Sequence, residues 1–482
     1  NVTIYGLSSY NCIEVAEIKT FTSSVITETV DRISLTSSAF LIGSFLASSN
    51  NKSLLNRIKS LELVEIKSIS SDKNHGSDVL KSAEYVKDLF SSLGLNTKIA
   101  TSGESRPAVL AQTEYDPKKK TVLLYAHHDV QPVGDIDKWK TEPFTPQIID
   151  GRLYGRGSGD NKAGVVTHYE VVKALKEDLP VNIKVFIEGE EEIGSPCMAE
   201  FLDEYQDDLE ADVIVIADSG NIKIATPTVT TSLRGLVDGF IVVEQPMRAV
   251  HSGLGGGVVP DAFMVLSKII ASFHNEKGEL QIEGLTPSDM EVLELEEKDI
   301  KEIFGSKDIN LFELDSISKR LWLEPALSIL AIDAPSTDEA VNLLIPNAKA
   351  KVSLRLPPTE NPEHAMKMLE EHIMKNIPWG AKVSFEPEAK GSGIVADPNK
   401  EFTKILVKNF EEVWDNNAAY MGVGGSIPFA NDFVEKFPNA ELVLVGAGDE
   451  EMGNAHAPNE SVQIEDIENL IKSLIKTLKD FS

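Results

Sequence analysis

Side chains that bind divalent cations follow four short apolar segments of this chain. TVLLYA (121–126) is followed by His127 and Asp129, VNIKVFI (181–187) by the acidic run EGEEE, DVIVIA (212–217) by Asp218, and ELVLV (441–445), within a dozen residues, by His456. Asp160 ends the glycine-rich turn GRGSG (155–159). Imidazole and carboxylate groups suit cations such as Zn²⁺, Mn²⁺ and Co²⁺. If the apolar segments are parallel strands, their carboxyl ends meet at one edge of a sheet, and these side chains converge there.

The positions of neighbouring residues along the chain predict different roles for their side chains. In an extended segment residues i and i+2 point the same way, so Asp129 lies beside His127 while His128 points away. A metal-bound imidazole usually donates its second N–H to a carboxylate, and Asp129 is placed to accept it. Adjacent Glu191 and Glu192 project differently, so one can bind a metal ion while the other acts as general base.

The charges of this group favour two metal ions over one. Two neutral imidazoles with the carboxylates of Asp160, Glu192 and Asp218 sum to −3. Two divalent ions with a hydroxide between them balance that charge, whereas one ion leaves the group negative, and clustered carboxylates resist joint ionisation. Two ions also lower the pKa of a shared water towards about 7. The sequence therefore predicts a dinuclear metal centre.

The elements that position these residues are typical of an α/β fold. The four apolar segments are nearly continuous in their hydrophobicity, as strands buried in a parallel sheet are. A helix is predicted between the first two, with apolar residues from Val165 to Leu175 on one face, and helical spacing also occurs over 54–64 and 79–93. We expect a mainly parallel sheet flanked by helices, with the metal ions at the carboxyl ends of its strands.

A second region, with a different pattern of strand-like and helical segments, begins near Arg234. It contains the strand-like segments 239–244 and 348–356 and helical patterns over 261–273 and 362–377, which together indicate a small α+β domain. The stretch 283–302, with eight acids and two lysines, is predicted to be a solvated helical insertion. We therefore divide the chain into an N-terminal extension (1–50), a catalytic domain in two parts (51–233 and 387–482) and an inserted domain (234–386).

The amino-acid composition argues against several classes of protein. The chain has 482 residues, a formal net charge of −30 and 42% hydrophobic residues, which is a globular composition. The excess of acids argues against nucleic acid and anionic membranes as partners, and two cysteines cannot form a disulfide framework. No apolar run is long enough to cross a bilayer, and we predict a cytoplasmic protein. The apolar run 39–47 lacks the basic flank of an export signal, so we expect a loosely ordered extension or an extra helix there.

Seven motifs together resemble those of the M20 family of co-catalytic metallopeptidases, and within it the dipeptidases of carnosine-dipeptidase type. In chain order they are LLYAHHDVQP, LYGRGSGDNKAG, FIEGEEEIGSP, the DS after VIVIA, AVHSG, GGSIP and NAHAPNES. The similarity extends from about Leu54 to Phe481. It implies hydrolysis of the amide bond of dipeptides or similar small peptides with a free C-terminal carboxylate. It also implies two divalent ions per subunit, with Zn²⁺ expected and Mn²⁺ or Co²⁺ as alternatives.

The resemblance implies which residues hold the metal ions. His127 and Asp218 would bind one ion, Glu192 and His456 would bind the other, and Asp160 would bridge the two. The peptide bond that follows Asp160 would be cis.

Other roles follow from the same resemblance. Glu191 would be the general base, and Asp129 the partner of His127. The inserted domain would be a lid through which the protein forms a homodimer. His251 would enter the active site, often from the partner subunit, to stabilise the oxyanion, and Arg355 would bind the substrate's carboxylate.

One motif departs from the family pattern. Carnosine-type dipeptidases usually have an Arg-Glu pair before GGSIP, where this chain has Gly422 and Val423. The backbone at Gly425 and the hydroxyl of Ser426 can still donate hydrogen bonds to a carboxylate. An N-acyl-amino-acid deacylase or desuccinylase stays open as an alternative function, as does a non-catalytic metal-binding module. A phosphate-binding enzyme is disfavoured because the acids repel phosphate.

Overall fold

The structure is a computed structural model, and it describes residues 62–425 and 428–482. The predictions made for residues 1–50, for the start of the helical pattern at 54–61 and for Ser426 lie outside the described residues.

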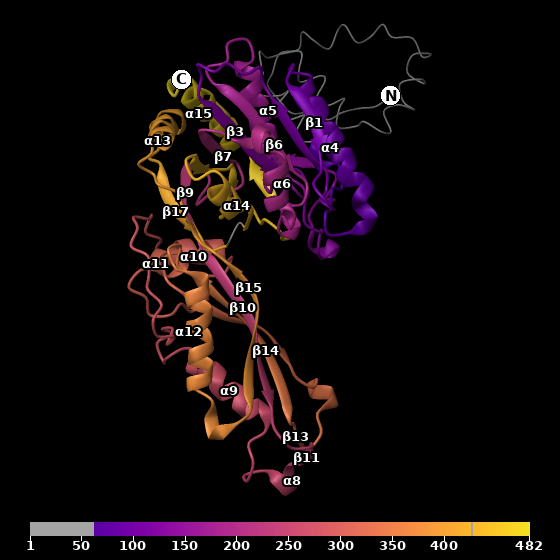
Figure 1. Ribbon diagram of the computed structural model, residues 1–482, viewed down its shortest axis with the longest axis vertical. Coiled ribbons are helices and arrows are strands. Elements are labelled where there is room, and N and C mark those ends of the chain that lie inside the picture. Colours follow the sequence, from indigo (N-terminus) through magenta and orange to yellow (C-terminus); the bar gives the residue numbers. More distant parts are fainter. Residues whose placement is uncertain (1–61, 426–427) are drawn as a thin grey trace, which may run out of the picture. The chain divides into compact units, whose positions relative to one another are not determined.

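A nine-stranded sheet forms the core of the larger domain (Figure 1). Its four central strands are the four apolar segments, and they are parallel as predicted. The pairings outside this centre are antiparallel except that of β17 with β9, so the sheet is mixed rather than mainly parallel. In spatial order the strands are β1 (Asn96–Ala100), β2 (Ala108–Gln112), β6 (Asn182–Glu188), β3 (Thr121–His127), β7 (Val213–Ile216), β18 (Glu441–Leu444), β9 (Thr228–Leu233) and β16 (Ile394–Val395), with β17 (Ala419–Val423) also on β9.

Helices cover both faces of this sheet because its strands are apolar on both sides. On β3, Val122, Leu124 and Ala126 belong to one hydrophobic cluster, while Leu123 and Tyr125 belong to the other. The first cluster is closed by α4 (Gly76–Ser91), α5 (Lys162–Leu175), α13 (Glu401–Trp414) and α15 (Ile464–Asp480). The second is closed by α6 (Met198–Glu204) and α14 (Pro428–Lys436). Each fully buried Val, Leu, Ile, Phe or Met side chain in these clusters contributes about 1.5–3 kcal/mol to the stability of the fold.

A separate four-stranded antiparallel sheet forms the inserted region. Its strands, in spatial order, are β12 (Ala326–Asp333), β14 (Asn347–Leu356), β10 (Gly235–Glu244) and β15 (Val383–Gly391). Helices α9 (Ala262–Ser272) and α12 (Pro362–Lys375) pack on one face, where alternate residues of β10 such as Val237 and Ile241 are buried. The second sheet thus continues to Gly391, beyond the predicted return at 387.

The acidic stretch 283–302 was predicted wrongly. Helix α10 (Glu297–Ile303) is the only helix in it, and not all of its apolar residues are exposed to solvent. Leu295 and Ile300 are buried in a cluster with Met421 of β17 and with α11 (Ile317–Trp322). The high count of acids concealed these apolar positions, which pack on the catalytic domain.

Small sheets fix the loops that surround the ends of the central strands. Strand β5 (Arg152–Tyr154) pairs with β4 (Gln147–Ile149) and with β20 (Ser461–Gln463). Tyr154 lies opposite Ser461, so the loop that leaves β5 lies beside the loop that enters β20. The other small sheets are β8 (Gly220–Asn221) with β19 (Gly448–Asp449), and β11 (Val250–His251) with β13 (Leu343–Leu344).

Short helices complete the described chain. They are η2 (Lys73–His75), η3 (Ile136–Lys138), η4 (Glu191–Ile193), α7 (Gln206–Leu209), α8 (Ser252–Gly255), η5 (Thr337–Glu339) and η6 (Pro378–Gly380). Among the described residues no helix has both the length and the apolar character needed to cross a membrane.

Candidate active site

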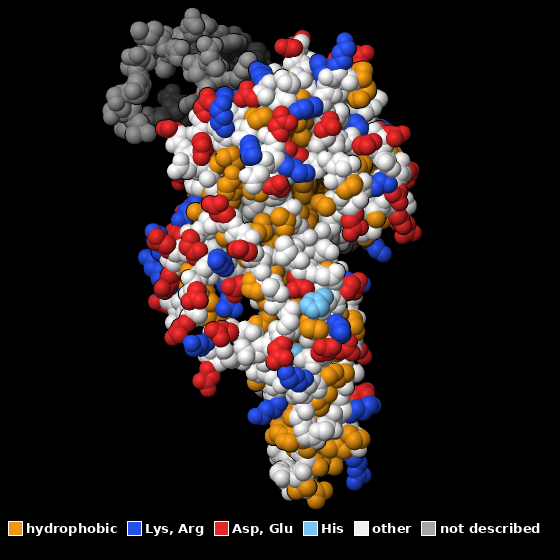
Figure 2. All heavy atoms as spheres, turned by 60° about the vertical axis from the view of Figure 1, so that its left-hand side comes forward, with side chains coloured by type: hydrophobic (Ala, Val, Ile, Leu, Met, Phe, Trp, Pro, Cys, Tyr) orange, Lys and Arg blue, Asp and Glu red, His pale blue; other side chains and the backbone are white. Residues whose placement is uncertain are grey.

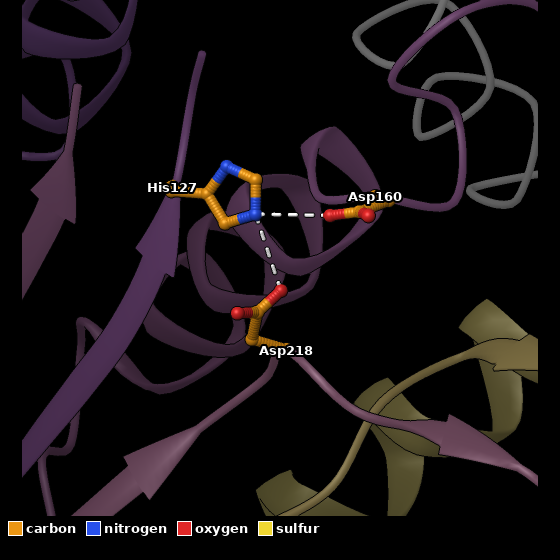
Figure 3. A group of neighbouring side chains, drawn as sticks. All are labelled: His127, Asp160 and Asp218. Atoms are coloured by element: carbon orange, nitrogen blue, oxygen red, sulfur yellow. Dashed lines mark hydrogen bonds and ion pairs between the residues drawn. The ribbon is translucent and has the colours of Figure 1, made fainter. Parts of the chain in front are cut away.

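The register of two parallel strands brings His127 and Asp218 together. Tyr125 of β3 lies opposite Ile216 of β7, so the residues two positions further along each chain also face each other. The His127 Nε2 atom is 3.2 Å from Asp218 Oδ1 and 3.0 Å from Asp160 Oδ1, which comes from the turn before α5 (Figure 3). The His127 side chain is fully buried.

The surroundings of His127 suit a cation. Its Nδ1 atom donates to the backbone carbonyl of Asp129 at 3.1 Å and lies 3.3 Å from the Asp129 carboxylate. In the neutral ring this leaves the Nε2 lone pair facing two carboxylate oxygens, which requires a proton or a metal ion between them. Asp129 Oδ2 also accepts the backbone N–H of Glu192 at 3.1 Å, so Asp129 contacts both halves of the site.

A second group of ligands shares Asp160 with the first. His456 Nε2 is 2.9 Å from Asp160 Oδ2 and 3.1 Å from Glu192 Oε2. Each group of three offers one atom per residue within 4.8 Å of the others: His127, Asp160 and Asp218 in one, and Asp160, Glu192 and His456 in the other. These five residues are the ones that the sequence selected as candidate metal ligands. Their neutral imidazoles and three carboxylates fit two divalent cations that share the two oxygens of Asp160.

Glu191 lies beside these groups and belongs to neither. Its Oε2 atom is 3.9 Å from His127 Nε2, and it lines the same pocket as Asp160, Asp218 and His456. Burial, together with the charges of Asp218 and Asp160, raises the pKa of Glu191 well above its usual value against the opposing charge of His127. A carboxylate with a raised pKa beside a metal site is suited to taking and returning a proton.

The charges and hydrogen bonds of these side chains shift one another's pKa values. Burial disfavours the charged form of His127, but Asp218, Asp129 and Asp160 raise the pKa of His127 well above its usual value. Hydrogen bonds to Asp160 and Glu192 raise the pKa of His456 to about 10. Burial and the charge of Asp160 raise the pKa of Glu192 to about 7. Without a metal ion the two imidazoles therefore hold protons in the places where cations would bind.

Sequence comparison assigns the family. The chain matches peptidase family M20/M25/M40 over residues 123–480. The chain belongs to the M20 peptidase family. It is 31% identical over 421 residues to the cysteinylglycine-S-conjugate dipeptidase of Corynebacterium striatum, covering 85% of this chain and 91% of that protein. It is 30% identical over 396 residues to the Beta-Ala-His dipeptidase of Mus musculus, covering 77% of this chain and 80% of that protein.

Structural comparison agrees with the family assignment. The di-peptidase Dug1p of Saccharomyces cerevisiae superposes with a TM-score of 0.73 and 26% sequence identity, covering 89% of this chain and 95% of that chain. The resemblance found in the motifs is thereby confirmed, and the protein is a metallopeptidase of the hydrolase class.

The remaining predicted site residues of this M20 peptidase lie outside the ligand groups. Arg355 is on β14 opposite Leu236, and its charge helps to lower the pKa of buried Arg234 to about 10, after burial itself. Gly425 is half-buried just after β17. His251 ends β11, is exposed, and accepts the N–H of Gly253 at 3.0 Å.

Asn161 was not recognised from the sequence as part of the site. Its Oδ1 atom accepts the backbone N–H of His127 at 3.3 Å, and its Nδ2 atom donates to the carbonyl of Ala217 at 2.6 Å. It thus ties the ends of β3 and β7 to the turn that carries Asp160. The bond between Asp160 and Asn161 is cis, as predicted. No sequence pattern marks Asn161 except its place beside Asp160.

Proposed function

We propose that this M20 peptidase hydrolyses dipeptides, or similar small peptides with a free C-terminal carboxylate, with two divalent metal ions, Zn²⁺ being the expected metal. The observation that carries the proposal is the pair of ligand groups that share Asp160, with Glu191 beside them. The names of the relatives, which describe dipeptidases acting on Cys-Gly and Beta-Ala-His, support a dipeptide substrate.

His127 and Asp218 would hold one ion, Glu192 and His456 the other, and Asp160 both. When bound, such ions polarise a carbonyl and make a water molecule acidic near neutral pH. Glu191 removes a proton from the attacking water and later delivers it to the leaving amine, for which its raised pKa is suited. Asp129 keeps the Nδ1 proton of His127 in place, so that Nε2 remains the ligand atom.

Arg355 would bind the C-terminal carboxylate of the substrate. It lies at the Gly235 end of β10, next to Arg234, whose backbone N–H bonds the carbonyl of Val423 in the pocket wall. A guanidinium group offers two parallel donors to a carboxylate. The backbone of Gly425 and the hydroxyl of Ser426 are proposed as further donors to the same group.

We propose that the inserted domain is a lid through which two chains form a homodimer. His251 follows the Glu244 end of β10, whereas Arg355 lies at the other end, and this ten-residue strand spans roughly 30 Å. His251 of the same chain is therefore too far away to stabilise the oxyanion, and the partner's His251 is the better candidate. Figure 2 shows apolar side chains gathered at this end of the second sheet, which suits a subunit interface. They include Leu254, Val258, Val259, Met264, Val341 and Leu343, all exposed.

Replacing Glu191 with Gln tests the proposed mechanism. The amide cannot accept the proton, so kcat should fall by about 10²–10⁴-fold. Both metal ions should remain, because Glu191 belongs to neither ligand group. Metal content by mass spectrometry and turnover of a dipeptide library give the two readings. Full activity of Glu191→Gln would reject its role as base.

A substrate panel separates the proposed dipeptidase from its alternatives. Dipeptides should be hydrolysed faster than N-acetyl- or N-succinyl-amino acids by the protein reloaded with each metal in turn. The opposite preference would establish a deacylase. Failure to cleave any amide with both ions bound would establish a metal-binding module. The cytoplasmic location stays a prediction.

Mixed dimers test whether His251 acts across subunits. His251→Ala and Glu191→Gln should each be nearly inactive alone. When the two chains are co-expressed, one site of each mixed dimer combines an intact Glu191 with the partner's intact His251, so activity should return. If His251 acted within its own chain, every site would lack one group and co-expression would restore nothing.

A further inference from the structure

Arg156 and Glu460 form an ion pair inside the catalytic domain. Arg156 Nη1 donates to Glu460 Oε2 at 2.6 Å, and each side chain is only 1% exposed. The two residues are 304 positions apart in the sequence. Arg156 belongs to the glycine-rich turn that ends in Asp160, and Glu460 follows the loop that carries His456. Both side chains bond the backbone of proposed metal ligands and not their side chains, and the proposed mechanism gives neither residue a role.

Glu460 organises the turn that ends in Asp160. One of its oxygens accepts the backbone N–H groups of Gly159 and Asp160, each at 3.0 Å. The other accepts the N–H of Gly157 at 3.0 Å in addition to Arg156. A carboxylate that receives four donors fixes the backbone on which the shared ligand stands.

Arg156 ties that turn to the loop of the other ligand. Its Nη2 atom donates to the carbonyl of His456 at 3.1 Å and to the carbonyl of Pro132 at 3.1 Å. His456 has a left-handed backbone with φ of 62°, so its side-chain direction depends on how this loop is held. The ion pair therefore connects the backbones of two ligands that belong to the same proposed metal site.

Stability alone is a poor explanation for this arrangement. A buried ion pair is often no more stabilising than a well-packed apolar pair of the same volume. Such a pair could not, however, bind three N–H groups of one loop and a carbonyl of another. We propose that Arg156 and Glu460 are positioning residues that hold Asp160 and His456 at the separation required by the second metal ion, before that ion binds. This inference rests on the proposed dinuclear function.

Glu460→Gln and Arg156→Lys test the pair. Gln keeps the shape but turns an amide group towards N–H donors, and Lys keeps the charge but cannot bind two carbonyls and Glu460 together. Zn²⁺ titration of the metal-free full chain against a competing chelator gives the affinity of each equivalent. We expect the ion that contacts Glu192 and His456 to bind about 10–100-fold more weakly in both variants, and the ion that contacts His127 and Asp218, which shares only Asp160 with that site, to be weakened less.

Glu441→Gln is the matched control. Glu441 is also buried, and its carboxylate accepts the N–H groups of Phe402 at 3.0 Å and Thr403 at 2.7 Å, at the amino end of β18 away from the ligands. It should lower the unfolding temperature and leave both Zn²⁺ affinities unchanged. Equal loss of both affinities in Glu460→Gln, or unchanged affinities, would overturn the inference. If the wild-type chain itself binds fewer than two ions, the proposed function fails instead.

Hydrogen exchange of the wild-type chain gives a second test that does not depend on a variant folding. In the metal-free protein the amides of Gly157, Gly159 and Asp160 should be protected, because Glu460 holds them without metal. Protection that develops only after Zn²⁺ is added would show that the metal orders the turn and would overturn the inference.

Discussion

The two halves of the ligand cluster are built in different ways. His127 and Asp218 stand at the ends of adjacent parallel strands, and the His127 side chain is 0% exposed. His456 stands on a loop between two short strands, and its side chain is 57% exposed. Asp160 contributes one oxygen to each half. One half is thus fixed by sheet register, and the other depends on contacts between loops.

This difference indicates where the site is rigid and where it can change. A register shift of β3 against β7 would turn their buried side chains to the opposite faces, so the first half cannot move without unfolding the core. In the second half Glu192 is only 3% exposed, whereas His456 depends on the hydrogen bonds that hold its loop, among them the bond from Arg156 to its carbonyl. An exposed, loop-borne ligand suits the side of the site through which water and substrate enter.

The largest expected difference between the halves is in how much each contributes to the unfolding free energy of the metal-free protein. In the metal-free protein His127→Ala leaves the buried carboxylate of Asp129 and the partly buried carboxylates of Asp218 and Asp160 without their cation, which should cost about 3–5 kcal/mol of unfolding free energy. His456→Ala also leaves Glu192 and one oxygen of Asp160 without their cation, but the lost side chain is 57% exposed, so the cost should be smaller than that of His127→Ala. Both variants should lose most of their activity. Denaturant unfolding in the presence of a chelator gives the comparison, and equal losses would mean that the halves do not differ in this way.

A smaller expected effect is the pH dependence of metal binding. At pH 7 the metal-free His456, whose pKa is raised to about 10, holds a proton, and Glu192, whose pKa is raised to about 7, is partly protonated. Metal ions need the neutral imidazole and the ionised carboxylate, so binding releases these protons and the affinity rises as the pH increases from 6 to about 10. Calorimetry in buffers of different ionisation enthalpy counts the protons. His456→Ala should release about one proton fewer. An affinity independent of pH over this range would contradict the assignment.

The same contrast explains what the sequence could predict. His127, Asp218 and the acids after β6 follow apolar strands directly, so a local pattern sufficed to select them. Arg156 and Glu460 act through a contact between segments 304 residues apart, and no local pattern reports such a contact. The antiparallel pairings of β2 with β6, β18 with β9 and β16 with β9 also join segments that are far apart in the sequence, which is why the mixed character of the sheet was not predicted.

The inserted region shows the other limit of sequence patterns. Strands β10 and β14 and helices α9 and α12 were predicted, but strands β12 and β15 were not. The acidic stretch was predicted wrongly because Leu295 and Ile300 lie among many charges. The position of His251 relative to the proposed ligands depends on the length of β10 and, in the proposed homodimer, on a second chain, and neither is encoded near His251 itself.

The central claim is that Asp160 is shared between two metal ions, one in each half. Crystals grown with Zn²⁺ and measured at the zinc absorption edge test it directly, because each ion gives its own anomalous peak. We expect two peaks roughly 3.5–4 Å apart, one touching His127 and Asp218, the other His456 and Glu192, and both touching Asp160. A single peak, or two peaks of which only one touches Asp160, would contradict the account.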